Sequence, residues 1–117
     1  MFAGIAAAII ASLQTGCGRL PASAKVVLMQ RLHASKIVEI RDVRHRSING
    51  FDYLGVSGTF EIPGNWEWYH TSVILRKGRS DADWSRAEMF SGITSVGPII
   101  ELSDHKFVEH LHPWPTN

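Results

Sequence analysis

The hydrophobic and polar positions between residues 37 and 77 predict three β-strands joined by two turns. From Ile37 to Val43, β-branched residues are mixed with charged ones, which is typical of strands with one face toward a core. Asn49-Gly50 is the dipeptide that a type I′ hairpin turn prefers, because both positions tolerate positive φ. Pro63-Gly64-Asn65 marks the second turn. We therefore expect an antiparallel three-stranded meander over about 37–77.

The third strand, 66–77, has two faces that are both partly apolar. A period of two places Trp66, Trp68, His70, Ser72 and Ile74 on one face, and Tyr69, Thr71, Val73 and Leu75 on the other. Such a strand is central, or covered on its second face by another element. In the middle strand, Gly55 and Gly58 indicate a bulge or strong coiling.

Shorter elements flank the meander. Pro21 and the apolar spacing over 21–34 favour a helix, with a short buried strand over 26–29 as the alternative. Ser80, Asp81 and Asp83 are typical of a helix cap and predict a helix over 81–90. The alternative there is a fourth strand, because polar and apolar residues also alternate from Trp84 to Phe90.

The C-terminal part predicts two more strands, Ile99–Leu102 and Phe107–Leu111, around the polar turn 103–105. The expected fold is therefore a β-rich α+β domain over 25–117. Its meander is extended by one or two C-terminal strands into a small sheet, sandwich or partial barrel, with one or two short helices.

Composition and charge refine this picture. A chain of 117 residues with 44% hydrophobic and 20% charged residues is ordinary for one globular domain. Residues 1–46 hold seven basic and two acidic residues, a charge of +5, and residues 81–117 hold two basic and six acidic residues, a charge of −4. This asymmetry indicates either a basic contact surface or two parts of the chain that attract each other, and we favour the second interpretation.

The N-terminal segment 1–24 begins with 13 uncharged, mostly apolar residues. This run is too short to span a bilayer but has the length of a signal-peptide core. Ala22-Ser23-Ala24 offers the small-x-small spacing that a signal peptidase accepts. A buried helix or strand of a cytoplasmic domain is the alternative.

Residues 14–17, which end in Thr15-Gly16-Cys17, resemble the lipobox of bacterial lipoproteins. The resemblance implies that Cys17 is lipidated after processing and anchors the chain to a membrane. Because Cys17 is the single cysteine, no internal disulfide can form.

Three groups of residues are candidate sites. Trp66, Trp68 and Tyr69, next to His70, could stack on a flat ligand or form part of the core. Arg44 and Arg46 would lie near Arg76 if the first and third strands share a sheet end, which would create a basic surface for single-stranded nucleic acid. On a C-terminal strand, His110 and His112 would share one face and could bind a divalent metal together with His105.

These observations favour a small exported, periplasmic or membrane-anchored domain that acts by binding or as a structural accessory and performs no chemistry. Its partner would be another envelope protein or a membrane surface. The alternatives are a metal-binding protein or metal-dependent enzyme that uses the C-terminal histidines, and a nucleic-acid-binding β module. The sequence has no Gly-rich phosphate loop, nucleophile elbow or Cys–His pair that would indicate an enzyme. No cofactor is expected apart from that metal.

Overall fold

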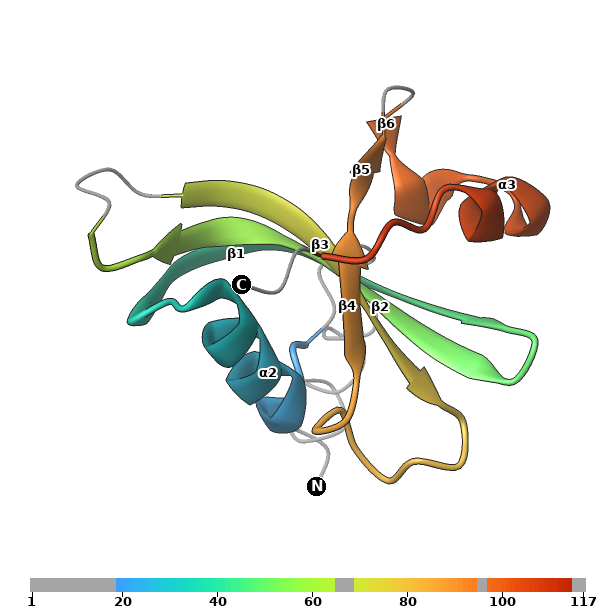
Figure 1. Ribbon diagram of the computed structural model, residues 1–117, viewed down its shortest axis with the longest axis horizontal. Helices are drawn as coiled ribbons and strands as arrows, with labels where there is room; N and C mark the ends of the chain where they lie inside the picture. Colours follow the sequence, from blue (N-terminus) through green and yellow to red (C-terminus); the bar gives the residue numbers. More distant parts are fainter. Residues whose placement is uncertain (1–18, 65–68, 95–96, 115–117) are drawn as a thin grey trace, which may run out of the picture.

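The computed structural model describes residues 19–64, 69–94 and 97–114. Its centre is a four-stranded antiparallel sheet in the order β1-β2-β3-β4 (Figure 1). The strands are β1 (Lys36–Ile48), β2 (Phe51–Glu61), β3 (Tyr69–Gly78) and β4 (Glu88–Ser91). The fold is thus β-rich α+β, and the sheet does not close into a barrel.

Two sets of smaller elements pack on opposite faces of this sheet. Helix α2 (Ala22–Leu32) precedes β1 and lies against one face, the α2 face. After β4, the short strands β5 (Ile93–Thr94) and β6 (Gly97–Pro98) pair with each other. The 3-10 helix η1 (Ile99–Glu101) and helix α3 (Asp104–Glu109) follow and pack on the other face, the α3 face.

The structure confirms the predicted meander and the helix before it. Asn49 and Gly50 have φ values of 51° and 84°, the two positive angles that a type I′ turn needs. Gly64 also has a positive φ, 93°. Ile48 pairs with Phe51 across the first turn, and the register from Val43 to Ile48 is regular.

The prediction of a helix over 81–90 is wrong. The alternative prediction, a fourth strand, is correct for Glu88–Ser91. The aspartates that were interpreted as a cap accept hydrogen bonds within turns. The Asp81 carboxylate accepts one from the Gly78 amide at 3.2 Å, and Asp83 accepts one from the Ser85 amide at 3.0 Å. Asp and Ser favour such turns as strongly as helix starts, so the residues alone did not separate the two cases.

The two predicted C-terminal strands are wrong as well. Residues 99–101 form η1, and residues 104–109 form α3. Phe107 is fully buried against the sheet, and Leu111 packs beside the same cluster. These two residues are four apart, a spacing that puts them on one side of a helical turn.

Two bulges give β1 an unusual hydrophobic spacing. Ile37, Ile40 and Val43 are three residues apart, yet all three pack toward α2 because the register shifts after Ile37 and again after Ile40. Opposite these bulges lies Gly58, where an added Cβ would approach the Glu39 carbonyl oxygen to 2.5 Å. The predicted bulge at the β2 glycines therefore lies in the strand that pairs with them.

Both faces of the sheet carry a hydrophobic core. The α2 core consists of buried residues from α2, the sheet and the β3–β4 connection: Ala24, Val27, Leu28, Leu32, Val43, Leu54, Val56, Phe60, Val73, Leu75, Trp84, Ala87 and Met89. The α3 core consists of Ile48, Tyr53, Ile74, Phe90, Ile99 and Phe107. The prediction that the third strand is apolar on both faces and covered on both is thus confirmed for residues 73–75.

Candidate ligand-binding face of the sheet

One part of the α3 face has no described element packed on it (Figure 1). Helices η1 and α3 cover the end near the β1–β2 turn, where Ile100 and Phe107 pack on the sheet. The remaining part, here called the open face, carries polar side chains from three adjacent strands. These are Asp42 and Arg44 of β1, Ser57 and Thr59 of β2, and His70 and Ser72 of β3.

Thr59 is buried on this face, with 2% of its surface exposed, and its hydroxyl has two partners. Arg41 donates a hydrogen bond from Nη1 to Thr59 Oγ1 at 2.7 Å and one from Nη2 to the Gly58 carbonyl at 3.2 Å. His70 Nδ1 lies 2.8 Å from the same Oγ1. The Thr59 hydroxyl therefore links Arg41 of β1 to His70 of β3.

Two serines lie side by side next to this cluster. Ser57 and Ser72 occupy directly paired positions on β2 and β3, and their Oγ atoms are 2.5 Å apart. One hydroxyl donates to the other, so the pair keeps one proton and several lone pairs for a ligand. The open face therefore offers both donors and acceptors in fixed positions.

A pocket of about 60 Å³ lies at the inner end of the open face. Its lining comes from β1, β2, β3, η1 and the residue between β4 and β5: Asp42, Arg44, Gly55, Val56, Ser57, Ser72, Val73, Ile74, Gly92, Ile100 and Glu101. Arg44 spans one side of it, with Nε 3.0 Å from Asp42 Oδ2 and Nη1 2.8 Å from Glu101 Oε2. This ion-pair chain joins β1 to η1.

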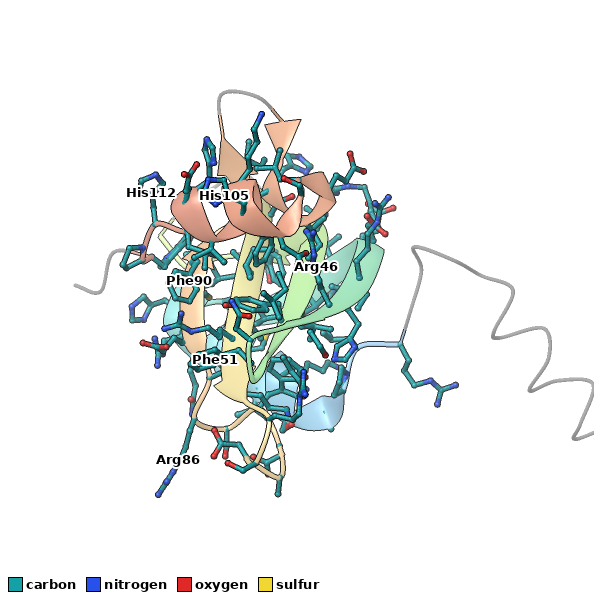
Figure 2. All side chains as sticks on the ribbon, turned by 90° about the vertical axis from the view of Figure 1, so that its right-hand side faces the viewer. Arg46, Phe51, Arg86, Phe90, His105 and His112 are labelled. Carbon is teal, nitrogen blue, oxygen red and sulfur yellow. The ribbon has the colours of Figure 1, made fainter. Side chains whose placement is uncertain are left out.

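The structure places Arg46, but not Arg44, in the same row of the sheet as Arg76. Arg46 pairs with Tyr53, and Tyr53 pairs with Arg76, so both arginines lie in one row across the sheet. Each is nevertheless engaged within the protein. Arg46 donates to Asp104 at 2.8 Å and lies over the Phe107 ring. Arg76 pairs with Glu88 and lies over Phe51 and Phe90, two side chains that Figure 2 labels.

Ion pairs in the structure agree with the interpretation that the basic and acidic parts of the chain attract each other. Arg44 pairs with Glu101, and Arg46 pairs with Asp104, so the basic β1 contacts the acidic C-terminal part. These ion pairs neutralise arginine side chains that a nucleic-acid-binding surface would need for contacts with phosphates.

The aromatic candidates are only partly within the described residues. Trp66 and Trp68 lie outside them, and so does Cys17. The backbone of Tyr69 pairs with Phe60. His70 is exposed and belongs to the open face.

The candidate metal ligands do not share the strand geometry on which their prediction depended. His105 lies in α3, with Nε2 2.9 Å from Glu109 Oε2, and His110 ends that helix, with Nδ1 2.8 Å from the Lys106 carbonyl. His112 follows in an extended segment whose carbonyl accepts from the Ser91 amide. Within 19–64, 69–94 and 97–114, no three histidine, cysteine or acidic side chains are grouped as metal ligands.

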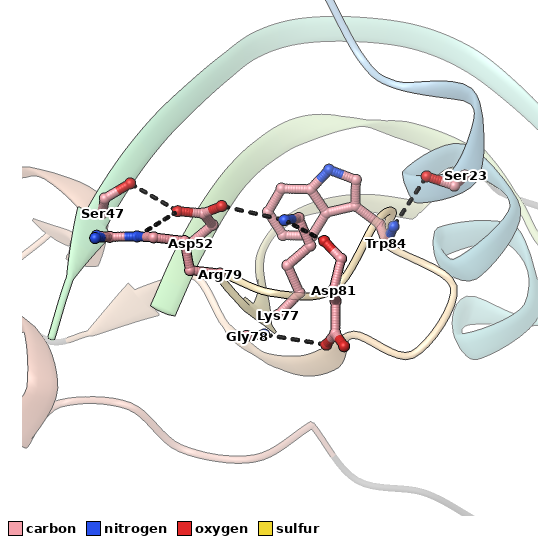
Figure 3. A network of polar contacts seen from close by, with 8 residues as sticks. All are labelled: Ser23, Ser47, Asp52, Lys77, Gly78, Arg79, Asp81 and Trp84. Carbon is pink, nitrogen blue, oxygen red and sulfur yellow. Dashed lines mark hydrogen bonds and ion pairs between the residues drawn. The ribbon is translucent and has the colours of Figure 1, made fainter. Parts of the chain in front are cut away.

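Sequence reasoning missed a polar network on the α2 face (Figure 3). Lys77 Nζ lies 3.1 Å from Asp52 Oδ2, donates to the Asp81 carbonyl at 3.1 Å, and lies over the Trp84 ring. Hydrogen bonds from Ser47 and Lys77 hold the pKa of Asp52 below its usual range, although burial acts in the opposite direction. Asp52 and Lys77 are paired by the register of β2 and β3. The sequence of the predicted turn at Pro63-Gly64-Asn65 does not indicate this register.

In comparisons with known proteins, the chain matches no family model, no curated protein and no solved structure. In the described part of the chain, no helix has the length and apolar character to cross a membrane. The open face and its pocket are therefore the starting point for function.

Proposed function

We propose that this chain is the binding domain of an exported or membrane-associated protein, and that its ligand binds to the open face of the sheet. The observation that carries the proposal is the pocket at the inner end of that face, where side chains from three strands and η1 present polar groups. Binding sites combine such positioned polar groups with apolar walls. The apolar segment 1–13 and the Thr15-Gly16-Cys17 motif that follows it support delivery to an envelope or membrane.

The open face is suited to binding because its side chains are held by one another. Thr59 fixes Arg41 and His70, and Ser57 fixes Ser72. Groups that are ordered before a ligand arrives lose less conformational entropy when they bind it. Burial limits the reactivity of Thr59, because its hydroxyl is not accessible to a substrate.

Binding is tested by NMR on isotope-labelled protein, with methylammonium, acetate, ethylene glycol and glucose added separately as probes. We expect at least one probe to give saturable amide shifts that are concentrated at Ser57, Ser72 and Ile100. If none of the four produces saturable shifts there, binding at the open face is refuted.

Delivery is tested separately, by expressing the full chain with a C-terminal tag and measuring the mass of its N-terminal end. We expect loss of the residues before Cys17 together with an added lipid mass. A cut before Lys25 would remove the first turn of α2, including the fully buried Ala24, and is not expected. An intact, unlipidated Met1 end would overturn the export part of the proposal and leave the binding part in place.

A further inference from the structure

The pocket beside Arg44 has features that select one kind of ligand group. We propose that it receives a primary alkylammonium group, the chemistry found in a lysine side chain or an ethanolamine headgroup. This inference rests on the proposed binding function of the open face and names the chemistry that the face recognises.

The size of the pocket sets the first limit. A cavity needs about 10–15 Å³ of this kind of volume to hold one water molecule, so a pocket of about 60 Å³ has room for a few heavy atoms. A short alkylammonium group fits this space. The rest of a larger ligand would lie over the open face.

The charge of the pocket sets the second limit. Its lining contains two carboxylates, Asp42 and Glu101, and one cation, Arg44. The formal charge of the lining is therefore negative by one unit, which attracts a cation and disfavours a carboxylate or phosphate. Arg44 contacts both carboxylates, so it holds them in place on the rim.

The hydrogen-bonding groups match the same ligand. Arg44 contacts Oδ2 of Asp42 and Oε2 of Glu101, so the second oxygen of each carboxylate can accept from a ligand. The hydroxyls of Ser57 and Ser72 add further acceptors on the floor. An ammonium group has three N–H donors and no acceptor, and it can use this set fully.

The apolar part of the lining fits the alkyl carbon. Ile74 of β3 and Ile100 of η1 contribute to the pocket lining, and both approach the Cα of Gly55 closely. A Cβ at residue 55 would lie 3.3 Å from a carbon of each isoleucine. Long basic groups bind in this manner, with the carbon chain on apolar surface and the charged end on carboxylates.

The experiment compares probes and variants in the full chain, with amide shifts at Ser57, Ser72 and Ile100 as the readout. We expect methylammonium to bind at least tenfold more tightly than ethylene glycol, a small neutral probe, and acetate to give no saturable shift. D42N and E101Q should each weaken methylammonium about tenfold or more, because charge-assisted hydrogen bonds have that effect.

E109Q is the matched control, because it removes one exposed carboxylate from α3, outside the pocket. It should leave the affinity for methylammonium within twofold of the original protein. Equal weakening by E109Q and D42N would show attraction by net charge alone and overturn the inference. The dispersion of the amide spectrum reports whether each variant is folded, and E101Q keeps the test valid if D42N is not.

The other outcomes separate this inference from the proposed function. If acetate, glucose or ethylene glycol binds as tightly as methylammonium or more tightly, the ammonium inference fails while ligand binding at the open face stands. If no probe binds, both fail. Nα-acetyl-lysine amide and phosphoethanolamine then distinguish the sources, since tighter binding of the first indicates a protein partner and of the second a lipid headgroup.

Discussion

The two cores of this protein hold their helices by different means. The α2 core is built mainly from aliphatic side chains, such as Leu28, Leu54 and Val56, which are almost completely buried. Half of the α3 core is aromatic, namely Tyr53, Phe90 and Phe107, and arginines lie over two of these rings. Tyr53 and Phe107 meet edge to face with ring centroids 4.8 Å apart, and Arg46 lies 4.8 Å above the Phe107 ring.

The two faces of one sheet can therefore respond differently to salt and pH. Aliphatic burial depends little on salt or pH. Cation–π contacts and exposed ion pairs such as Arg46–Asp104 weaken as ionic strength rises. Helix η1, which lines part of the candidate pocket, lies on the α3 face, where these salt-sensitive contacts occur.

The largest expected effect comes from breaking the α2 core. L28A removes a fully buried side chain from α2, and we expect it to lower the free energy of unfolding by about 2–5 kcal/mol. Urea denaturation followed by circular dichroism measures the change. Q30A, on the exposed side of the same helix, should stay within about 0.5 kcal/mol of the original protein. Similar losses for the two variants would contradict the assignment of this core.

A smaller global effect is expected from breaking the α3 core. F107A removes the fully buried ring of α3, and because α3 has only six residues it should detach without unfolding the sheet. Hydrogen exchange should show lost protection at the His110 amide, which donates to Lys106, and retained protection at Val73. Equal loss at both amides would mean that the two cores unfold together.

The Asp52–Lys77 pair brings charge to the α2 face, whose core is mainly aliphatic. The folded protein lowers the pKa of Asp52, so the pair stabilises the protein above the ordinary carboxyl pKa of about 3.9. That contribution is lost as the pH falls through the lowered value. We expect D52N to cost about 1–2 kcal/mol at pH 7 and to make stability less dependent on pH between about 4 and 2. An unchanged acid dependence in D52N would assign the acid sensitivity to other carboxylates.

The smallest effect concerns the ion pairs of the α3 side. R46Q should lower the free energy of unfolding by about 1 kcal/mol, and 1 M NaCl should reduce the difference between R46Q and the original protein. R31Q is the control on the α2 side, where Arg31 makes one long hydrogen bond to the Ala87 carbonyl. A greater salt effect on R31Q than on R46Q would reverse the proposed contrast.

Local turn chemistry explains why the meander could be predicted. Asn49-Gly50 and Pro63-Gly64 specify backbone angles that few other residues adopt, and the strands between them follow. The segment 81–111 could not be predicted in the same way. Asp81, Asp83 and Phe107 are compatible with several local structures, and contacts with the sheet decide among them.

The candidate site was only partly predictable for a related reason. Alternation along the third strand indicates His70, and the expectation that the first and third strands share a sheet end indicates Arg44 and Arg46. The pairing of Ser57 with Ser72 and the approach of Glu101 to Arg44 depend on register and on the position of η1. Neither leaves a local signal in the sequence.

The bulges of β1 have a consequence for sequence alignment. Val38 and Arg41 are the residues by which β1 exceeds its partner positions on β2. Deleting either would leave the remaining residues on their present faces, whereas deleting Val43 would reverse every position on one side of it. An alignment that permits gaps only in loops would therefore shift Ile37 and Ile40 against their true counterparts in a relative that lacks a bulge. Searches for such relatives should permit single-residue gaps inside this strand.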